Sequence, residues 1–162
     1  MEVYLMAQII KSPEELSFDP DIPTVFLAGS IEMGSAGNWQ TIVENQLQDD
    51  NIVILNPRRV EWDSSWIQSI DNSIFREQVE WELEAQERAD IIAMYFEPKT
   101  KAPITLLELG LFAHSNKLIV CCPDGFWRKG NVDIVCNRYG IKMVEGLQEL
   151  IENIKEALKT YF

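Results

Sequence analysis

The chain has 162 residues, 46% of them hydrophobic, and its 14 Lys and Arg against 26 Asp and Glu give a net charge of −12. This length and composition predict one globular domain over residues 1–162 and exclude a disordered chain. The acidic balance argues against polymeric nucleic acid or an anionic membrane as a partner, because like charges repel. Neither a signal peptide nor an apolar run of membrane-spanning length is found, so we expect a cytoplasmic protein.

The first half of the chain predicts two strand–helix units after an irregular start. Residues 1–22 form a short apolar lead-in and a loop that contains prolines. A nearly uniform apolar run over residues 24–30 predicts a strand covered on both faces, followed by a Gly-rich turn. Helical spacing begins at Asn38, a suitable N-cap, and residues 51–57 predict the second strand. Residues 57–71 show no clear period.

The second half continues the alternation of strands and helices. A helix is expected over residues 72–88 with Phe75, Val79 and Leu83 on one face, and a strand over residues 90–96. Another helix begins near Pro103, and it precedes a strand over residues 117–122, a loop over residues 123–133, a short strand over residues 141–144 and an amphipathic C-terminal helix. The pattern predicts a doubly wound, flavodoxin-like parallel sheet of about five strands between two helical layers.

The cysteines offer neither a disulfide framework nor the spacing of a zinc site. They number three, Cys121, Cys122 and Cys136, and two of them are adjacent. Cys121 and Cys122 lie in a predicted buried strand, so we interpret them as small core residues. No metal site is expected.

Glu108 is the only formally charged residue between Lys101 and Lys117. Apolar residues surround it on every face of the predicted helix, and a buried carboxylate is costly unless it is compensated. Such a residue is suited to general acid–base catalysis or nucleophilic attack. The alternative is a structural glutamate that pairs with an arginine or caps a backbone group.

Ligands of this type of fold bind beyond the carboxyl ends of the strands. The segments expected there are residues 29–37, 56–66, 97–103 and 123–133. They contain much of the unusual chemistry of the chain, namely Ser30, Arg58, Arg59, Trp62, Arg128, Lys129 and Asn131. The helix that carries Glu108 begins at the same edge of the sheet.

Three segments resemble the nucleoside 2-deoxyribosyltransferase superfamily: Phe-Leu-Ala-Gly-Ser-Ile at 26–31, Ala-Asp at 89–90 and Leu-Glu-Leu-Gly at 107–110. The chain is more similar to the second, less characterised branch of that superfamily. In that branch Gly-Ser-Ile-Glu precedes Trp39, Asn-Pro-Arg-Arg at 56–59 precedes Trp62, and Gly-Phe-Trp-Arg-Lys-Gly-Asn-Val-Asp stands at 125–133. The resemblance spans residues 24 to 145.

The resemblance implies cleavage or transfer of an N-glycosidic bond through a covalent glycosyl-enzyme, as in retaining glycosidases. By this match Glu108 is the nucleophile. The second acid is Glu82, which lies eight residues before Asp90 at a position where the family usually has Asp. From composition alone, Glu82 belongs to a solvated helix face that is rich in glutamate.

Two departures from the family lie at the expected substrate pocket. Phe26 stands where the family often has a Tyr, and Ala102 stands where nucleoside-specific members have Asp and monophosphate-specific members have Ser. The loop that begins with Gly29 and Ser30 and includes Gly34, Ser35 and Gly37 can offer backbone N–H groups to a phosphate. Arg58, Arg59 and Arg128 can add charge-assisted hydrogen bonds, so the sequence favours a phosphorylated ligand.

The resemblance also implies a shared active site. Residues 123–133 are similar to a segment that enters the pocket of a neighbouring subunit, where Asn131 and Asp133 would contact substrate. We therefore expect a homodimer or a larger homo-oligomer. Asn56 lies in the motif of the branch, and Trp39 and Trp62 are candidates for stacking on a base.

The leading hypothesis is an enzyme that cleaves or transfers the N-glycosidic bond of a nucleoside or nucleoside 5′-monophosphate, without a metal or organic cofactor. A catalytically weak module that binds or senses a nucleotide is the first alternative, and Phe26 and Ala102 favour it. A structural α/β subunit with a buried Glu–Arg pair is the second alternative.

Overall fold

A computed structural model describes residues 5–30, 38–60 and 62–161 of the chain. The strands are β1 (Gln8–Lys11), β2 (Thr24–Gly29), β3 (Val53–Asn56), β4 (Ile91–Tyr95), β5 (Leu118–Cys121) and β6 (Lys142–Val144). The helices are α1 (Trp39–Leu47), α2 (Ser73–Arg88), α3 (Pro103–Phe112), α4 (Lys129–Tyr139) and α5 (Leu147–Leu158), and a 3₁₀ turn follows at Lys159–Tyr161. Within these ranges no helix is long and apolar enough to cross a membrane.

The six strands of the described residues form one parallel sheet in the order β1-β3-β2-β4-β5-β6. From β2 the chain crosses to β3 on one side, and it then returns to β4 on the other side. The crossovers diverge between β2 and β4, where Gly29 is paired with Tyr95. Such a switch point leaves a crevice at the carboxyl ends of the strands, where α/β proteins bind ligands. The predicted doubly wound, flavodoxin-like fold is confirmed.

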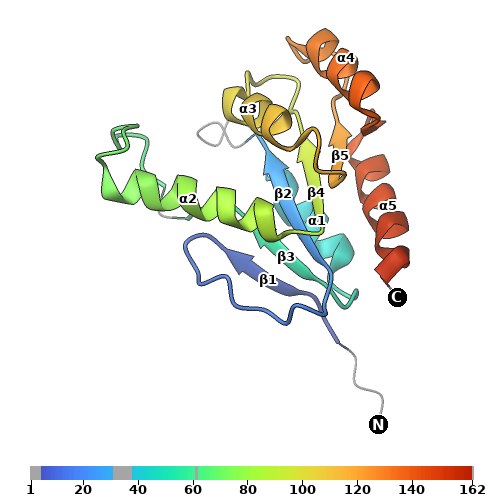
Figure 1. Ribbon diagram of the computed structural model, residues 1–162, viewed down its shortest axis with the longest axis horizontal. Helices are drawn as coiled ribbons and strands as arrows, with labels where there is room; N and C mark the ends of the chain where they lie inside the picture. Colours follow the sequence, from blue (N-terminus) through green and yellow to red (C-terminus); the bar gives the residue numbers. More distant parts are fainter. Residues whose placement is uncertain (1–4, 31–37, 61, 162) are drawn as a thin grey trace.

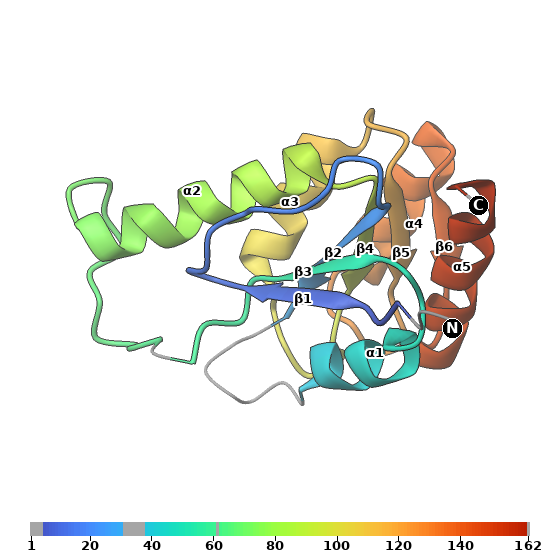
Figure 2. The ribbon, with the colours of Figure 1, turned by 90° about the horizontal axis from the view of Figure 1, so that it is seen from below.

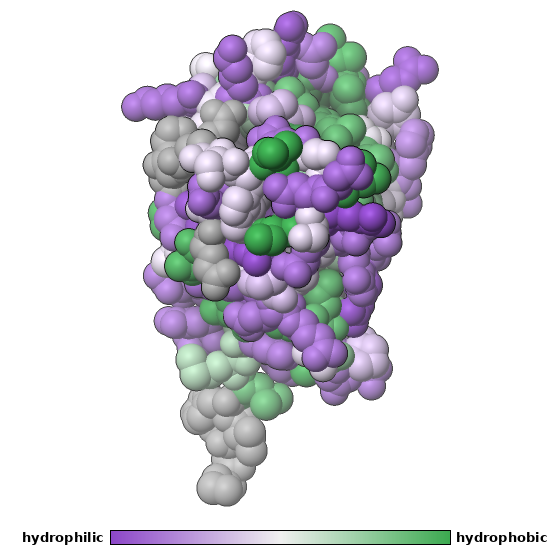
Figure 3. Space-filling model, turned by 90° about the vertical axis from the view of Figure 1, so that its left-hand side faces the viewer, coloured by the Kyte–Doolittle hydropathy of each residue, from purple (hydrophilic) through white to green (hydrophobic). Residues whose placement is uncertain are grey.

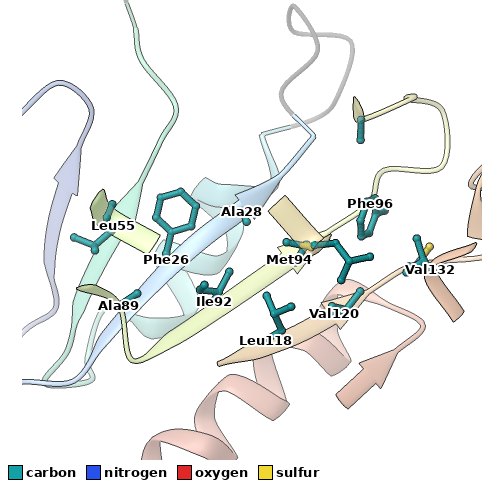
Figure 4. Close-up of a cluster of buried hydrophobic side chains, with 14 of the residues drawn as sticks. Phe26, Ala28, Leu55, Ala89, Ile92, Met94, Phe96, Leu118, Val120 and Val132 are labelled. Carbon is teal, nitrogen blue, oxygen red and sulfur yellow. The ribbon is translucent and has the colours of Figure 1, made fainter. Parts of the chain in front are cut away.

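Helices cover both faces of the sheet (Figures 1 and 2). The helices α2, α3 and α4 pack on one face through a core that includes Phe26, Met94 and Val120, shown in Figure 4. The helices α1 and α5 pack on the other face around Leu27 and Ile54. Burial on both faces explains why the inner strands are almost uniformly apolar in the sequence.

The cysteines are core residues. Cys121, Cys122 and Cys136 are free and buried, which confirms the interpretation of the first two as small core side chains.

Two elements of the fold differ from the prediction. The lead-in contains β1, an edge strand in which only Ile10 is fully buried, so its sequence lacks the apolar run of an inner strand. Residues 123–133 were predicted as a loop, but α4 begins within them, at Lys129. That helix buries Val132 and Cys136 one turn apart and ends at Gly140, whose positive φ of 66° is easily adopted by glycine.

The buried face of α2 is more polar than predicted. The helix buries Gln78, Trp81, Ala85 and Gln86. The stripe of Phe75, Val79 and Leu83, which we expected to face the core, is only partly buried. Two glutamine side chains, Gln78 and Gln86, are therefore buried on α2.

Candidate functional site

Two carboxyl groups meet where α2 packs beside α3. Glu108, in the second turn of α3, is only 8% exposed. Glu82 of α2 is partly exposed and lies close enough to raise the pKa of Glu108 by charge repulsion. Burial is the larger cause for Glu108 and the main cause for Glu82, so the pKa of both groups is raised. The pair can therefore retain one proton near neutral pH, which suits one ionised and one protonated partner.

Glutamine amides support both carboxyl groups. The Nε2 of Gln86 donates to Oε2 of Glu108, and it also donates to the carbonyl oxygen of Glu82 at 3.1 Å. The Nε2 of Gln78 donates to Oε1 of Glu82 at 3.2 Å and to the carbonyl oxygen of Pro57 at 2.9 Å. Gln78, Glu82 and Gln86 are spaced by four residues, so they lie along one face of α2.

The network extends from these helices to the edge strand. The hydroxyl of Ser12 donates to Oε1 of Gln78, which fixes the orientation of that amide. Over the described part of the chain, no Arg or Lys lies within ion-pairing distance of Glu108. The hypothesis of a structural Glu–Arg pair at this position is therefore wrong for these residues.

Several hydrogen bonds fix the chain where β2 ends, at the carboxyl edge of the sheet. The hydroxyl of Ser30 accepts from the N–H of Glu97 at 3.2 Å and lies 2.8 Å from the hydroxyl of Thr100. The indole N–H of Trp39 donates to the carbonyl oxygen of Ser30 at 3.2 Å. Gly29 leaves room for this indole, because an added Cβ would come within 2.6 Å of Trp39 Cζ2. Trp39 is thus buried against the switch point.

A second polar cluster lies at the end of β3, on the side of α1. Asn56 donates to Oε1 of Glu44 at 2.6 Å and accepts from the N–H of Arg58 at 2.9 Å. The Nε of Arg58 donates to Oε1 of Gln40 at 3.2 Å. Burial lowers the pKa of the Arg58 guanidinium. The structure thus joins two predicted site residues, Asn56 and Arg58, to two that the sequence interpretation did not include.

The connection from β3 to α2 carries the other predicted aromatic and basic residues. Arg59 forms an ion pair with Glu77 at 2.9 Å, and its guanidinium lies 5.3 Å from the ring of Trp66. Trp62 packs edge-on against Trp66 with ring centroids 5.1 Å apart. Figure 3 turns this end of the molecule toward the viewer and shows hydrophobic side chains set among mostly hydrophilic ones. The exposed hydrophobic residues of this region are Val60, Ile67, Ile70 and Ile74.

The predicted residues near α4 are apart from the two carboxyl groups in sequence and are held by local contacts. The guanidinium of Arg128 lies 4.5 Å from the ring of Trp127, whose indole N–H donates to the carbonyl oxygen of Lys101. Asp133 forms an ion pair with Lys129 at 3.3 Å, and Asn131 is exposed. Lys129, Asn131 and Asp133 lie in the first two turns of α4 and Arg128 is its N-cap residue, whereas the sequence predicted a loop.

The two departures from the family lie in the core. Phe26 is 1% exposed and Ala102 is 3% exposed, so neither position offers a polar group to a ligand. Ala102 has a positive φ of 44° and immediately precedes α3. The proposed phosphate loop beyond Ser30, with Gly34, Ser35 and Gly37, falls outside the described residues. Among the residues that are described, no group of three His, Cys, Asp or Glu is placed to hold a metal ion.

Sequence interpretation missed the amide partners Gln40, Gln78 and Gln86. A signal for two of them is present, because Gln78 and Gln86 flank Glu82 at intervals of one helical turn. Their burial could not be predicted from the sequence of α2, since four other glutamates make the helix resemble a solvated surface: Glu77, Glu80, Glu84 and Glu87. Only the packing of α3 shows which face is covered.

Comparison with known proteins gives the fold and the family of the chain. No curated protein matches the chain. A crystal structure of a conserved protein from Enterococcus faecalis V583 is similar with a TM-score of 0.60 and 14% identity, over 85% of this chain and 99% of that chain, which shows a shared fold. The family model described as nucleoside 2-deoxyribosyltransferase like matches residues 22–126. The chain therefore belongs to the nucleoside 2-deoxyribosyltransferase-like family, whose name points to glycosyl transfer on small nucleoside substrates.

Proposed function

We propose that the protein cleaves or transfers the N-glycosidic bond of a nucleoside or nucleoside 5′-monophosphate, with Glu108 as the nucleophile. The observation that carries the proposal is the pair of carboxyl groups on α2 and α3, each held by a glutamine amide and each with a raised pKa. Perturbed carboxyl groups of this kind are typical of acid–base and nucleophilic sites. Membership of the family supplies the class of bond.

In the first step, a carboxylate oxygen of Glu108 attacks the anomeric carbon of the sugar. The bond between this carbon and the base nitrogen breaks, and its electron pair leaves with the base. The pair holds one proton near neutral pH, and the reactive form is the one in which Glu108 is ionised and Glu82 carries this proton and gives it to the departing base. The pKa of Glu108 is the higher of the two, so this form is the minor one in the free protein. The product of this step is a glycosyl ester on Glu108.

In the second step, water or another base attacks the same carbon. Glu82 now takes the proton of the attacking group, and the electron pair of the ester bond returns to the carboxylate of Glu108. The sugar carbon is positively charged in both transition states, so an anion at Glu108 is stabilised when the barrier is crossed. The amide of Gln86 donates to Oε2 of Glu108 and so holds the carboxylate in place.

We propose that the other candidate residues, which lie at the carboxyl ends of the strands, bind the substrate. Asn56, Arg58 and Arg59 follow β3, Gly29 and Ser30 end β2, and Trp62 offers a partly exposed ring. Ser30 and Trp39 contribute by shaping the floor of the crevice, because both are buried and bonded within the protein.

The test is a panel of nucleosides and nucleoside 5′-monophosphates, assayed for free base by chromatography. Wild-type protein should release base from at least one substrate, and Glu108→Gln should lose about 10³-fold or more in rate, a size in keeping with loss of a catalytic nucleophile. Circular dichroism and unfolding must show that the variant is folded. Equal rates for the two proteins would remove Glu108 from the mechanism.

The alternative is a nucleotide-binding module with little catalytic power, supported by the buried apolar side chains of Phe26 and Ala102. It predicts a rise in melting temperature with a nucleotide and no release of base from any substrate in the panel. Release of base that depends on Glu108 would exclude it.

We also propose that two or more copies of the chain assemble through α3 and α4. The helix α3 exposes Ile104, Leu107 and Leu111 along one stripe, and Ile134 of α4 and Trp127 just before that helix are also exposed. An apolar surface of this kind is suited to association. Assembly would bring Arg128, Asn131 and Asp133 toward a neighbouring copy, as the family resemblance leads us to expect.

A further inference from the structure

The cluster between α1 and the end of β3 is distinct from the two carboxyl groups. It contains Gln40, Glu44, Asn56 and Arg58, of which the first three are buried. Asn56 binds Glu44 and the backbone of Arg58, and Arg58 binds Gln40. The side chains therefore hold one another in fixed positions.

Two donors of this cluster lack an acceptor. The Nε2 of Gln40 and the Nη2 of Arg58 are buried, and neither has a hydrogen-bond partner in the described part of the protein. Gln40 has 0% exposure, so its amide cannot turn to solvent. A buried donor without an acceptor destabilises the fold, and such groups in native proteins usually bind water, an ion or a ligand.

The missing acceptor should be an anion. Arg58 is positively charged, and none of the described carboxylates lies within ion-pairing distance of it. Glu44 is already used, because Oε1 accepts from Asn56 at 2.6 Å and Oε2 lies 3.9 Å from Nζ of Lys11. Gln40 is also the second residue of α1, a nine-residue helix whose N-terminus favours negative charge.

We propose that Gln40 and Arg58 bind the phosphate group of a nucleoside 5′-monophosphate substrate. Arg58 is partly exposed as a residue at the carboxyl end of the sheet, whereas its Nη2 and the Nε2 of Gln40 are buried, so a phosphate reaches both donors only when the surrounding side chains shift. Guanidinium and amide groups donate well to phosphate oxygens. The inference rests on the proposed function for the nucleoside part of the ligand, whereas the anion site stands on the cluster itself.

Gln40→Glu is the test variant. It keeps the size of the side chain, removes the amide donor and places a carboxylate beside Arg58, where Oε1 of Gln40 already accepts from Nε at 3.2 Å. The new carboxylate should pair with Arg58 and repel phosphate, so we expect a folded protein with an equal or higher melting temperature. The matched control is Gln46→Glu, which makes the same charge change at an exposed position of α1.

Isothermal titration calorimetry should measure the binding of inorganic phosphate, nucleoside 5′-monophosphates and the matching nucleosides. Each ligand is titrated into wild type, Gln40→Glu and Gln46→Glu. Wild type and Gln46→Glu should bind the monophosphate at least about tenfold more tightly than the nucleoside. Gln40→Glu should lose this preference and should bind inorganic phosphate at least about tenfold more weakly than wild type. Binding of phosphate alone to wild type with no preference for the nucleotide would identify a site for the free ion and would contradict the substrate assignment.

Equal phosphate affinity in wild type and Gln40→Glu would overturn the proposal, and so would a wild type that binds no phosphate. The two buried donors would then be satisfied by water. Release of base is measured separately on the same panel. If the preference for monophosphate over nucleoside depends on Gln40 but no base is released, the proposed reaction is contradicted and the anion site stands. If base is released at equal rates from nucleosides and from their 5′-monophosphates, the reaction stands and the phosphate site is contradicted.

Discussion

Gln86 donates a hydrogen bond from its side-chain amide to the carboxylate of Glu108, across 22 residues of sequence and from one helix to the next. The same amide also binds the backbone of α2 at Glu82. One side chain thus fixes the distance between the nucleophile that we propose and the helix that carries its partner acid. Its hydrogen bond lowers the pKa of Glu108, against the larger effect of burial.

Gln86→Met should shift the pH dependence of the reaction. The variant keeps the length of the side chain but loses the donor that stabilises the ionised form of Glu108. The pKa of Glu108 should rise, so the increase of kcat with pH should move to higher pH by about one unit. Gln48→Met, at an exposed position after α1, is the control. An unchanged pH profile with a merely lowered melting temperature would assign Gln86 a structural role only.

Stability should fall as pH rises through the range in which the two acids ionise. The ordinary pKa of a glutamate, 4.5, describes the unfolded chain, whereas burial raises the pKa to about 7 for Glu82 and about 8 for Glu108. The folded protein therefore holds more protons than the unfolded chain between these values, so the contribution present below pH 4.5 is lost by about pH 8. One pKa unit corresponds to about 1.4 kcal/mol, so the loss should reach a few kcal/mol.

Urea unfolding from pH 4.5 to 8.5 measures this effect. The Glu82→Gln/Glu108→Gln variant should show a much shallower fall than wild type, because neither amide titrates. An equal fall in both proteins would mean that other groups cause the pH dependence.

Gly29→Ala should destabilise the fold at the switch point. An added Cβ would lie 2.6 Å from Trp39 Cζ2 and closer still to the carbonyl oxygen of Tyr95, and the backbone oxygen cannot move aside. We expect a loss of about 2–4 kcal/mol in the free energy of unfolding. Gly110→Ala is the matched control, because nothing lies within 4 Å of its added Cβ, and alanine should stabilise α3 by about 0.5–1 kcal/mol. Equal effects of the two variants would contradict the close packing of Trp39 on Gly29.

Leu107→Glu should dissociate the proposed assembly. Leu107 is 59% exposed on the apolar stripe of α3, and a glutamate there would place a charge inside the interface. Sedimentation velocity should report monomers for this variant and a dimer or larger species for wild type. Ile42→Glu alters an exposed residue of α1 and should keep the wild-type mass. A monomeric wild type would contradict the proposed assembly.

The sequence predicted the inner sheet well because parallel strands that are covered on both faces are apolar at every position. The strand over residues 24–30 and β2 agree to within one residue. The edge strand β1 could not be found in the same way, since Gln8 and Ile9 are exposed and only Ile10 is fully buried. The helix α4 was hidden by Gly130 and by residues of weak helix propensity, although the spacing of Val132 and Cys136 was a usable signal.

The sequence identified the two acids of the candidate site, Glu82 and Glu108, but not the glutamines that form hydrogen bonds within it. Glu108 stood out because no other charged residue lies near it in the sequence, and the structure buries it as expected. Glu82 followed from the family resemblance. The contacts of Gln86 with Glu108 and of Gln40 with Arg58 join separate elements, and no local pattern encodes them.

Covalent capture of the sugar tests the central claim most directly. A nucleoside or nucleoside 5′-monophosphate with fluorine at the 2′ position should react and then hydrolyse slowly, because fluorine destabilises the positively charged transition state of both steps. Mass spectrometry of the digested protein should find the mass of the fluoro sugar on the peptide that contains Glu108, and not in Glu108→Gln. Release of base with no adduct, or an adduct on another residue, would contradict the assignment of Glu108 as the nucleophile.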